Sequence, residues 1–82
     1  MKKFEIKAQD GSKFGELDIQ EEMPCKEIYK GVAQLLGVPQ SEVAVYHNSK
    51  RVPNDGTKAR DAINFEGESV LIAVPKDGTG WL

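Results

Sequence analysis

The sequence is poor in the residues from which disulfides, metal sites and membrane spans are built. It has one cysteine, Cys25, so no internal disulfide can form, and one histidine, His47, so no Cys/His cluster indicates a zinc site. No apolar run approaches the roughly 20 residues that a membrane-spanning helix needs. Because a lone cysteine suits a reducing compartment, we expect a cytoplasmic protein that requires no metal.

Charge of either sign is not concentrated in the chain. The 11 Lys and Arg residues nearly balance the 13 Asp and Glu residues, which gives a net charge of −2. Basic residues are scattered, singly or in pairs such as Lys2-Lys3 and Lys50-Arg51, and form no stripe of the kind that nucleic-acid binding needs. We therefore expect neither nucleic acid nor a membrane as a partner. The 82 residues are enough for one domain.

The first twenty residues alternate between apolar and charged side chains in two runs, 4–8 and 14–20. Alternation with a period of two is typical of strands that are buried on one face. Between the runs, Asp10-Gly11 supplies the positive φ of a tight turn, and Gly15 indicates a bulge in the second run. The pattern predicts an antiparallel hairpin.

Apolar residues then recur at helical spacing from Cys25 to Leu36. Pro24 suits the first position of this helix, Gly37 suits a left-handed C-cap, and Pro39 prevents the helix from continuing. Cys25 falls on the apolar face, where a free cysteine is ordinarily a small core residue. We expect a structural cysteine here rather than a nucleophile.

A third strand is predicted over residues 43–47. Val43, Val45 and His47 share one face and Ala44 and Tyr46 the other, so His47 is expected at the edge of the core. A short fourth strand at 51–52 and a one-turn helix capped by Thr57 follow. The unbroken apolar run 70–74 is typical of a central strand. Together these elements predict an α+β fold with a mixed four- to five-stranded sheet and one packed helix.

The order and spacing of several short segments resemble ubiquitin from residue 17 to about residue 67. These segments are Leu17-x-Ile19, the helix from Pro24, Leu36-Gly37-Val38-Pro39, Val45-Tyr46-His47-Asn48-Ser49-Lys50, Asn54-Asp55-Gly56-Thr57 and Ala62-Ile63. The resemblance implies a ubiquitin-like β-grasp domain over residues 1–74 and a flexible C-terminal tail over residues 75–82.

The resemblance also implies a patch on one sheet face that partner proteins recognise. Its central position falls on Tyr46, and its flanking positions fall on Leu71 and Ala73 if one extra residue is placed near Glu68. Alternation puts Ala44 beside Tyr46. The expected partner-binding residues are therefore Ala44, Tyr46, Leu71 and Ala73. The alternative is that Tyr46 is an ordinary half-exposed strand tyrosine.

The C-terminal residues raise the question of processing. The family ends in two glycines, whose positions fall near Thr79 and Gly80, and Trp81 and Leu82 follow. In the family the terminal carboxylate threads a narrow enzyme channel, where a Cβ would clash. The resemblance thus implies a precursor that is cleaved between Gly80 and Trp81. The alternative is an ordinary chain end with turn-forming residues.

Three functions remain open at this stage. The first is a protein modifier, a monomer whose partners are an adenylating activating enzyme, a conjugating enzyme, a processing peptidase and target proteins. Lys50 is then the candidate acceptor lysine for chains, although an ordinary solvated lysine is the alternative. The second is a non-covalent interaction module, and the third is a sulfur carrier. No carboxylate pair, phosphate-binding loop or metal-ligand spacing is found, so we expect neither an enzyme nor a cofactor.

Overall fold

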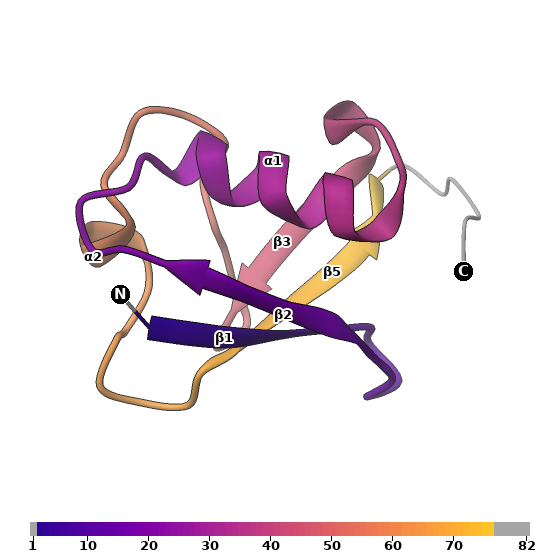
Figure 1. Cartoon of the computed structure of the whole chain (residues 1–82), viewed down its shortest axis with the longest axis horizontal. Helices are drawn as coiled ribbons and strands as arrows, with labels where there is room; N and C mark the ends of the chain where they lie inside the picture. Colours follow the sequence, from indigo (N-terminus) through magenta and orange to yellow (C-terminus); the bar gives the residue numbers. More distant parts are fainter. Residues whose placement is uncertain (1, 77–82) are drawn as a thin grey trace.

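The computed structural model describes residues 2–76 and confirms the predicted fold class. A mixed five-stranded sheet packs against one main helix in a β-grasp-like arrangement (Figure 1). The elements in chain order are β1 (Lys2–Lys7), β2 (Lys13–Ile19), α1 (Cys25–Leu36), the 3-10 turn η1 (Gln40–Glu42), β3 (Val43–His47), β4 (Lys50–Arg51), α2 (Ala59–Ala62) and β5 (Val70–Pro75).

The strands lie in the order β2-β1-β5-β3-β4. β1 and β5 run parallel, and the other neighbouring pairs are antiparallel. β5 is the central strand, as its unbroken apolar run predicts. Because alternate side chains of a strand point to opposite faces, β5 contributes both to the core under α1 and to the outer face of the sheet.

The first hairpin contains the predicted bulge beside Gly15. Ile6 pairs with Gly15, but the next residue, Lys7, pairs with Lys13, so Phe14 is an extra residue on β2. Such a bulge bends the strand and increases its twist. Strand β2 is therefore bent beside Gly15.

Helix α1 lies across one face of the sheet and buries its apolar side against it (Figure 1). It ends at Leu36 as predicted, with Gly37 at a φ of 74° and the Gly37 N–H donating to the Ala33 carbonyl at 2.8 Å. The buried residues of α1 are Cys25, Ile28, Tyr29, Val32 and Ala33. Neither helix of the described residues combines the length and the apolar character that crossing a bilayer requires.

Backbone carbonyls, rather than a side chain, cap the N-terminus of α1. The Cys25 N–H donates to the Thr57 carbonyl at 2.8 Å, and the Lys26 N–H donates to the Asp55 carbonyl at 2.9 Å. Pro24 lies at the N-cap, one position before the predicted one. The loop before α2 thus satisfies N–H groups that a helix start leaves without intrahelical partners.

The segment before α1 caps α2 in return. The Ala59 N–H donates to the Met23 carbonyl at 2.8 Å, and the Arg60 N–H donates to the Glu21 carbonyl at 3.0 Å. The prediction that Thr57 caps this helical turn is wrong, because the residue after it occupies the N-cap. The Thr57 carbonyl instead accepts from the Cys25 N–H at the start of α1. The segments that precede the two helices thus cap each other's N-termini.

The Tyr29 hydroxyl links α1 to the β3–β4 hairpin. The Val52 N–H donates to the Val45 carbonyl at 2.8 Å, as in an antiparallel pair. The return bond is replaced by the hydroxyl, which accepts from the Val45 N–H at 3.3 Å and donates to the Val52 carbonyl. Tyr29 is fully buried, so these three groups depend on one another for hydrogen bonding.

We expect the substitution Tyr29→Phe to lower the free energy of unfolding by about 2 kcal/mol, because it leaves a buried N–H and a buried C=O without their shared partner. Urea denaturation measures the change. Tyr46→Phe is the matched control, since it makes the same replacement at a half-buried residue on the outer face of the sheet. Equal stability of the two variants would contradict the structural role of the Tyr29 hydroxyl.

Gly37→Ala is expected to cost about 1 kcal/mol of folding free energy, because Gly37 has a left-handed backbone that disfavours a Cβ. No atom lies within 4 Å of the added Cβ, so a clash does not contribute. Gly56→Ala has equally open space without that backbone conformation and is expected to change stability little. Thermal unfolding of both variants separates backbone strain from any general effect of replacing glycine.

Candidate functional site

Apolar side chains from β3 and β5 form a strip on the outer face of the sheet, on the side away from α1. Tyr46 lies directly opposite Ile72, and Ala44 lies opposite Val74. Tyr46, Ile72 and Val74 are half-buried, whereas Ala44 is only 4% exposed. Because no helix covers this face in the described part of the chain, the three larger side chains are available for contact (Figure 1).

The predicted placement of Leu71 and Ala73 on this face is wrong. Both side chains are fully buried in the core under α1, where Ala73 lies opposite Val45. The sequence comparison assumed one extra residue near Glu68, and an error of one residue moves every side chain of a strand to the opposite face. Of the four residues expected to bind partners, Tyr46 alone has substantial exposure.

The strip contains a shallow groove of about 360 Å³, lined by Gln9, Tyr46, Ser49, Ile72 and Val74. The aromatic and aliphatic members come from the two neighbouring strands β3 and β5. The polar members come from the turns that follow β1 and β3. A concave apolar floor with a few polar groups at its rim is the usual character of a binding site. We call this feature the outer-face groove.

The turn between β3 and β4 forms one wall of the outer-face groove. Its two central residues, Asn48 and Ser49, have φ values of 51° and 69°. Two residues with positive φ are typical of the two-residue hairpin turn that suits the twist of the strands. Asparagine tolerates this conformation, but serine is strained there. Ser49 therefore lines the groove in a backbone conformation that glycine would adopt more easily.

Basic side chains flank the apolar strip. Arg51 is the cross-strand neighbour of Tyr46, and Lys7 pairs in register with Ile72. Beyond the strip, ion pairs lie along β1 and β2 at N···O distances of 3.1 to 3.8 Å. Lys13–Glu5 and Lys3–Glu16 join the two strands, whereas Lys7–Glu5 lies within β1 and Lys13–Glu16 within β2. Exposed pairs of this kind contribute little stability. They mark the border at which the apolar strip gives way to a solvated surface.

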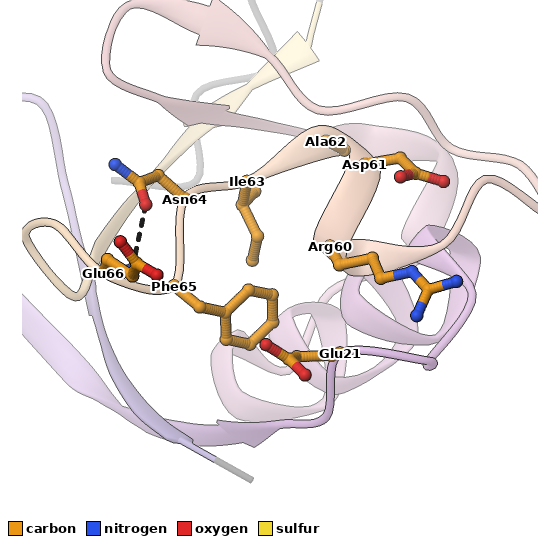
Figure 2. Close-up of a pocket in the computed structure, with 8 residues that line it drawn as sticks. All are labelled: Glu21, Arg60, Asp61, Ala62, Ile63, Asn64, Phe65 and Glu66. Atoms are coloured by element: carbon orange, nitrogen blue, oxygen red, sulfur yellow. Dashed lines mark hydrogen bonds between the residues drawn. The ribbon is translucent and has the colours of Figure 1, made fainter.

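A second depression, of about 450 Å³, lies beside α2 (Figure 2). Figure 2 shows Ile63 and Phe65 pointing toward one another, with Arg60 and Asp61 directed away from them. Phe65 packs edge-to-face on Phe4, with ring centroids 5.4 Å apart. Residues 2–76 hold no group of three metal-ligating side chains here or elsewhere. The apolar residues of this depression are thus largely engaged in supporting the core.

His47 has a structural role, which confirms its predicted place at the edge of the core. It is 4% exposed, and both ring nitrogens are hydrogen-bonded. Nε2 accepts from the Asn64 N–H at 3.1 Å, which leaves Nδ1 to donate to the Val70 carbonyl at 3.1 Å. His47 thus joins β3 to the start of β5 and to the loop that precedes it.

Cys25 is also a core residue, as predicted. It is the first residue of α1, and its side chain is fully buried. Burial, followed by the nearby charges of Asp55 and Asp61, raises the pKa of the Cys25 thiol. A thiol that is buried and protonated at neutral pH is a poor nucleophile. The position of Cys25 supports packing and gives no geometry for catalysis.

The remaining predicted site residues are placed as follows. Lys50 is exposed on β4, next to the turn that lines the outer-face groove. Gly80 and Trp81, the predicted processing site, lie outside the described residues. Sequence reasoning missed Ile72 and Val74, because every residue from Val70 to Val74 is apolar and the sequence therefore does not show which of them face outward.

Comparison with known proteins adds no relative to this description. The chain matches no model of a known protein family, and a search of curated proteins finds no significantly similar sequence. The assignment of a site therefore depends on the fold and on the geometry of the outer-face groove.

Ser49→Gly is expected to raise the free energy of unfolding by about 1 kcal/mol, because glycine adopts the left-handed conformation of this position without strain. Chemical denaturation measures the gain. Ser12→Gly replaces a serine in the other hairpin turn, where φ is not positive, and no gain is expected there. A Ser49→Gly variant no more stable than the parent protein would show that the turn is not strained.

Proposed function

We propose that this protein is a ubiquitin-like modifier of the cytoplasm, recognised through the outer-face groove and joined to target amines through Gly80. The main observation that supports the proposal is the position of β5. This strand supplies Ile72 and Val74 to the groove and leads directly into the C-terminal segment. A partner that docks on the groove therefore also holds the chain shortly before Gly80. Recognition and chemistry are coupled through a single strand.

The chemistry that this proposal requires takes place at Gly80. A processing peptidase hydrolyses the bond between Gly80 and Trp81 and leaves a Gly80 carboxylate. An adenylating enzyme joins this carboxylate to the AMP part of ATP and releases pyrophosphate. A thiol of the activating or conjugating enzyme displaces AMP, and a lysine amine of the target displaces the thiol to form an isopeptide bond. The modifier itself is a substrate throughout and supplies no catalytic group.

We assign recognition by these enzymes, and by proteins that bind the attached modifier, to Tyr46, Ile72 and Val74. A half-buried aromatic ring beside two aliphatic side chains has the character of an interface anchor. Lys50, which is exposed close to the groove, is the proposed acceptor if the modifier forms chains.

A non-covalent interaction module is the second candidate, and the same groove favours it. In that case the C-terminal residues take no part in the function. Deletion of residues 77–82 leaves β5 complete and separates the two candidates. A module keeps its partners after this deletion and loses them in Ile72→Asp, whereas a modifier loses its covalent adducts in both variants.

We expect covalent adducts of the tagged protein in the cells that make it, and we expect Gly80→Val to abolish them. The added side chain blocks the narrow approach that the activated carboxylate needs. Trypsin cleaves after Lys76, so each modified target lysine should carry the remnant Asp77-Gly78-Thr79-Gly80. Mass spectrometry of tryptic digests detects this remnant directly.

Gly56→Val is the matched control for this experiment. It makes the same replacement at an exposed loop position where no atom lies within 4 Å of the added Cβ. The control should retain the remnant on target lysines. Adducts that persist in Gly80→Val, or that lack the remnant in the parent protein, would refute conjugation through Gly80.

A further inference from the structure

The chain contains three Asp-Gly dipeptides, and two of them, Asp10-Gly11 and Asp55-Gly56, lie within the described residues. Aspartate isomerises most readily before glycine, because glycine has no side chain to hinder the approach of its backbone nitrogen to the preceding carboxyl. All four residues of the two dipeptides are exposed. The dipeptides differ in how the fold holds the glycine nitrogen.

The aspartate side chains of the two dipeptides are held in the same way. Asp10 Oδ1 accepts from the Ser12 N–H at 2.9 Å, and Asp55 Oδ1 accepts from the Thr57 N–H at 2.8 Å. A bond of this kind folds each carboxyl back over the glycine that follows it. Hydrogen bonds from Ser12 and Thr57 also lower the pKa of the two carboxyls, because they stabilise the ionised form.

The glycine nitrogens are held differently. The Gly11 N–H donates to the Ala8 carbonyl at 3.0 Å inside the first hairpin turn. The Gly56 N–H has no hydrogen-bond partner among residues 2–76. A nitrogen whose hydrogen is held by a carbonyl must break that bond before it can attack a neighbouring carbon. Of the two glycine nitrogens, that of Gly56 is therefore the one that is free to react.

We propose that Asp55 is a site of spontaneous isomerisation to isoaspartate, and that this modification removes a cap of α1. The Gly56 nitrogen forms a bond to Asp55 Cγ, and the hydroxyl of the protonated carboxyl leaves with the amide proton as water. One water molecule then adds to the former backbone carbonyl of the cyclic imide, and the bond from this carbon to the Gly56 nitrogen breaks. The chain now runs through Cβ and Cγ of Asp55, with no change in mass.

The carbonyl that leaves the main chain is one of the two that cap α1. The Asp55 carbonyl accepts from the Lys26 N–H at 2.9 Å, and the Thr57 carbonyl accepts from the Cys25 N–H at 2.8 Å. Isomerisation turns the first carbonyl into a carboxylate outside the main chain and lengthens the main chain by one carbon just before the second. The helix start thereby loses acceptors for its free N–H groups. Cys25, which is fully buried at this helix start, becomes accessible.

Incubation of the 82-residue protein at mildly acidic pH tests the modification, because more of each carboxyl is then protonated. Trypsin releases the two dipeptides in separate fragments, residues 8–13 and 52–58. Electron-transfer dissociation of these fragments distinguishes isoaspartate from aspartate. We expect several-fold more isoaspartate at Asp55 than at Asp10. An equal or smaller amount at Asp55 would overturn the proposal.

Two controls show whether the fold causes the difference. In urea the bond from Gly11 to the Ala8 carbonyl is absent, so Asp10 and Asp55 should isomerise at similar rates. A preference for Asp55 that is unchanged in urea would assign it to the neighbouring residue types and overturn the role of the fold. In the folded protein, Gly56→Ala hinders the attacking nitrogen with a methyl group, where no other atom lies within 4 Å. It should reduce isoaspartate at Asp55 several-fold and leave Asp10 unchanged.

Alkylation of Cys25 by iodoacetamide tests the effect on α1, because the chain has no other cysteine. The incubated protein should react in two phases, and the amplitude of the faster phase should equal the fraction that contains isoaspartate. Gly56→Ala, incubated in the same way, should show the slower phase alone. A protein that contains isoaspartate but reacts only slowly would overturn the loss of the cap. None of these results depends on the proposed function, since conjugation through Gly80 is measured separately on target lysines.

Discussion

The hydrogen bonds of the Tyr29 hydroxyl set the position of the β3–β4 hairpin and, with it, one wall of the outer-face groove. The hydroxyl replaces one bond of the Val45–Val52 pair, so a helical side chain takes part in the sheet ladder. A buried polar group that lacks a hydrogen-bond partner lowers the stability of the fold, whereas a paired one fixes the relative positions of the groups that it joins. The core under α1 therefore determines where Tyr46 stands on the opposite face of the same strand.

Local sequence rules predicted those features whose causes are local. Gly37 ends α1 because the left-handed conformation suits glycine. The bulge beside Gly15 follows from the break in alternation on β2, and the inward direction of His47 follows from alternation on β3. The α+β architecture and the central position of β5 could be predicted in the same way, from periodicity and from an unbroken apolar run.

Features that depend on contacts between distant segments could not be predicted. The run from Val70 to Val74 is apolar throughout, so its outward residues are decided by pairing with β3 rather than by its own pattern. The wrong choice of Leu71 and Ala73 has this cause. Capping of α1 by backbone carbonyls near Thr57 cannot be recognised from the residue types, because every residue has a backbone carbonyl.

We propose a processed modifier in which strand β5 supplies part of the recognition face and precedes the reactive Gly80 along the chain. The most direct test is the intact mass of the protein recovered from the cells that make it. We expect a species that ends at Gly80 and lacks Trp81 and Leu82. Recovery only of species that retain Trp81 would contradict processing and would leave the outer-face groove as the site of a non-covalent function.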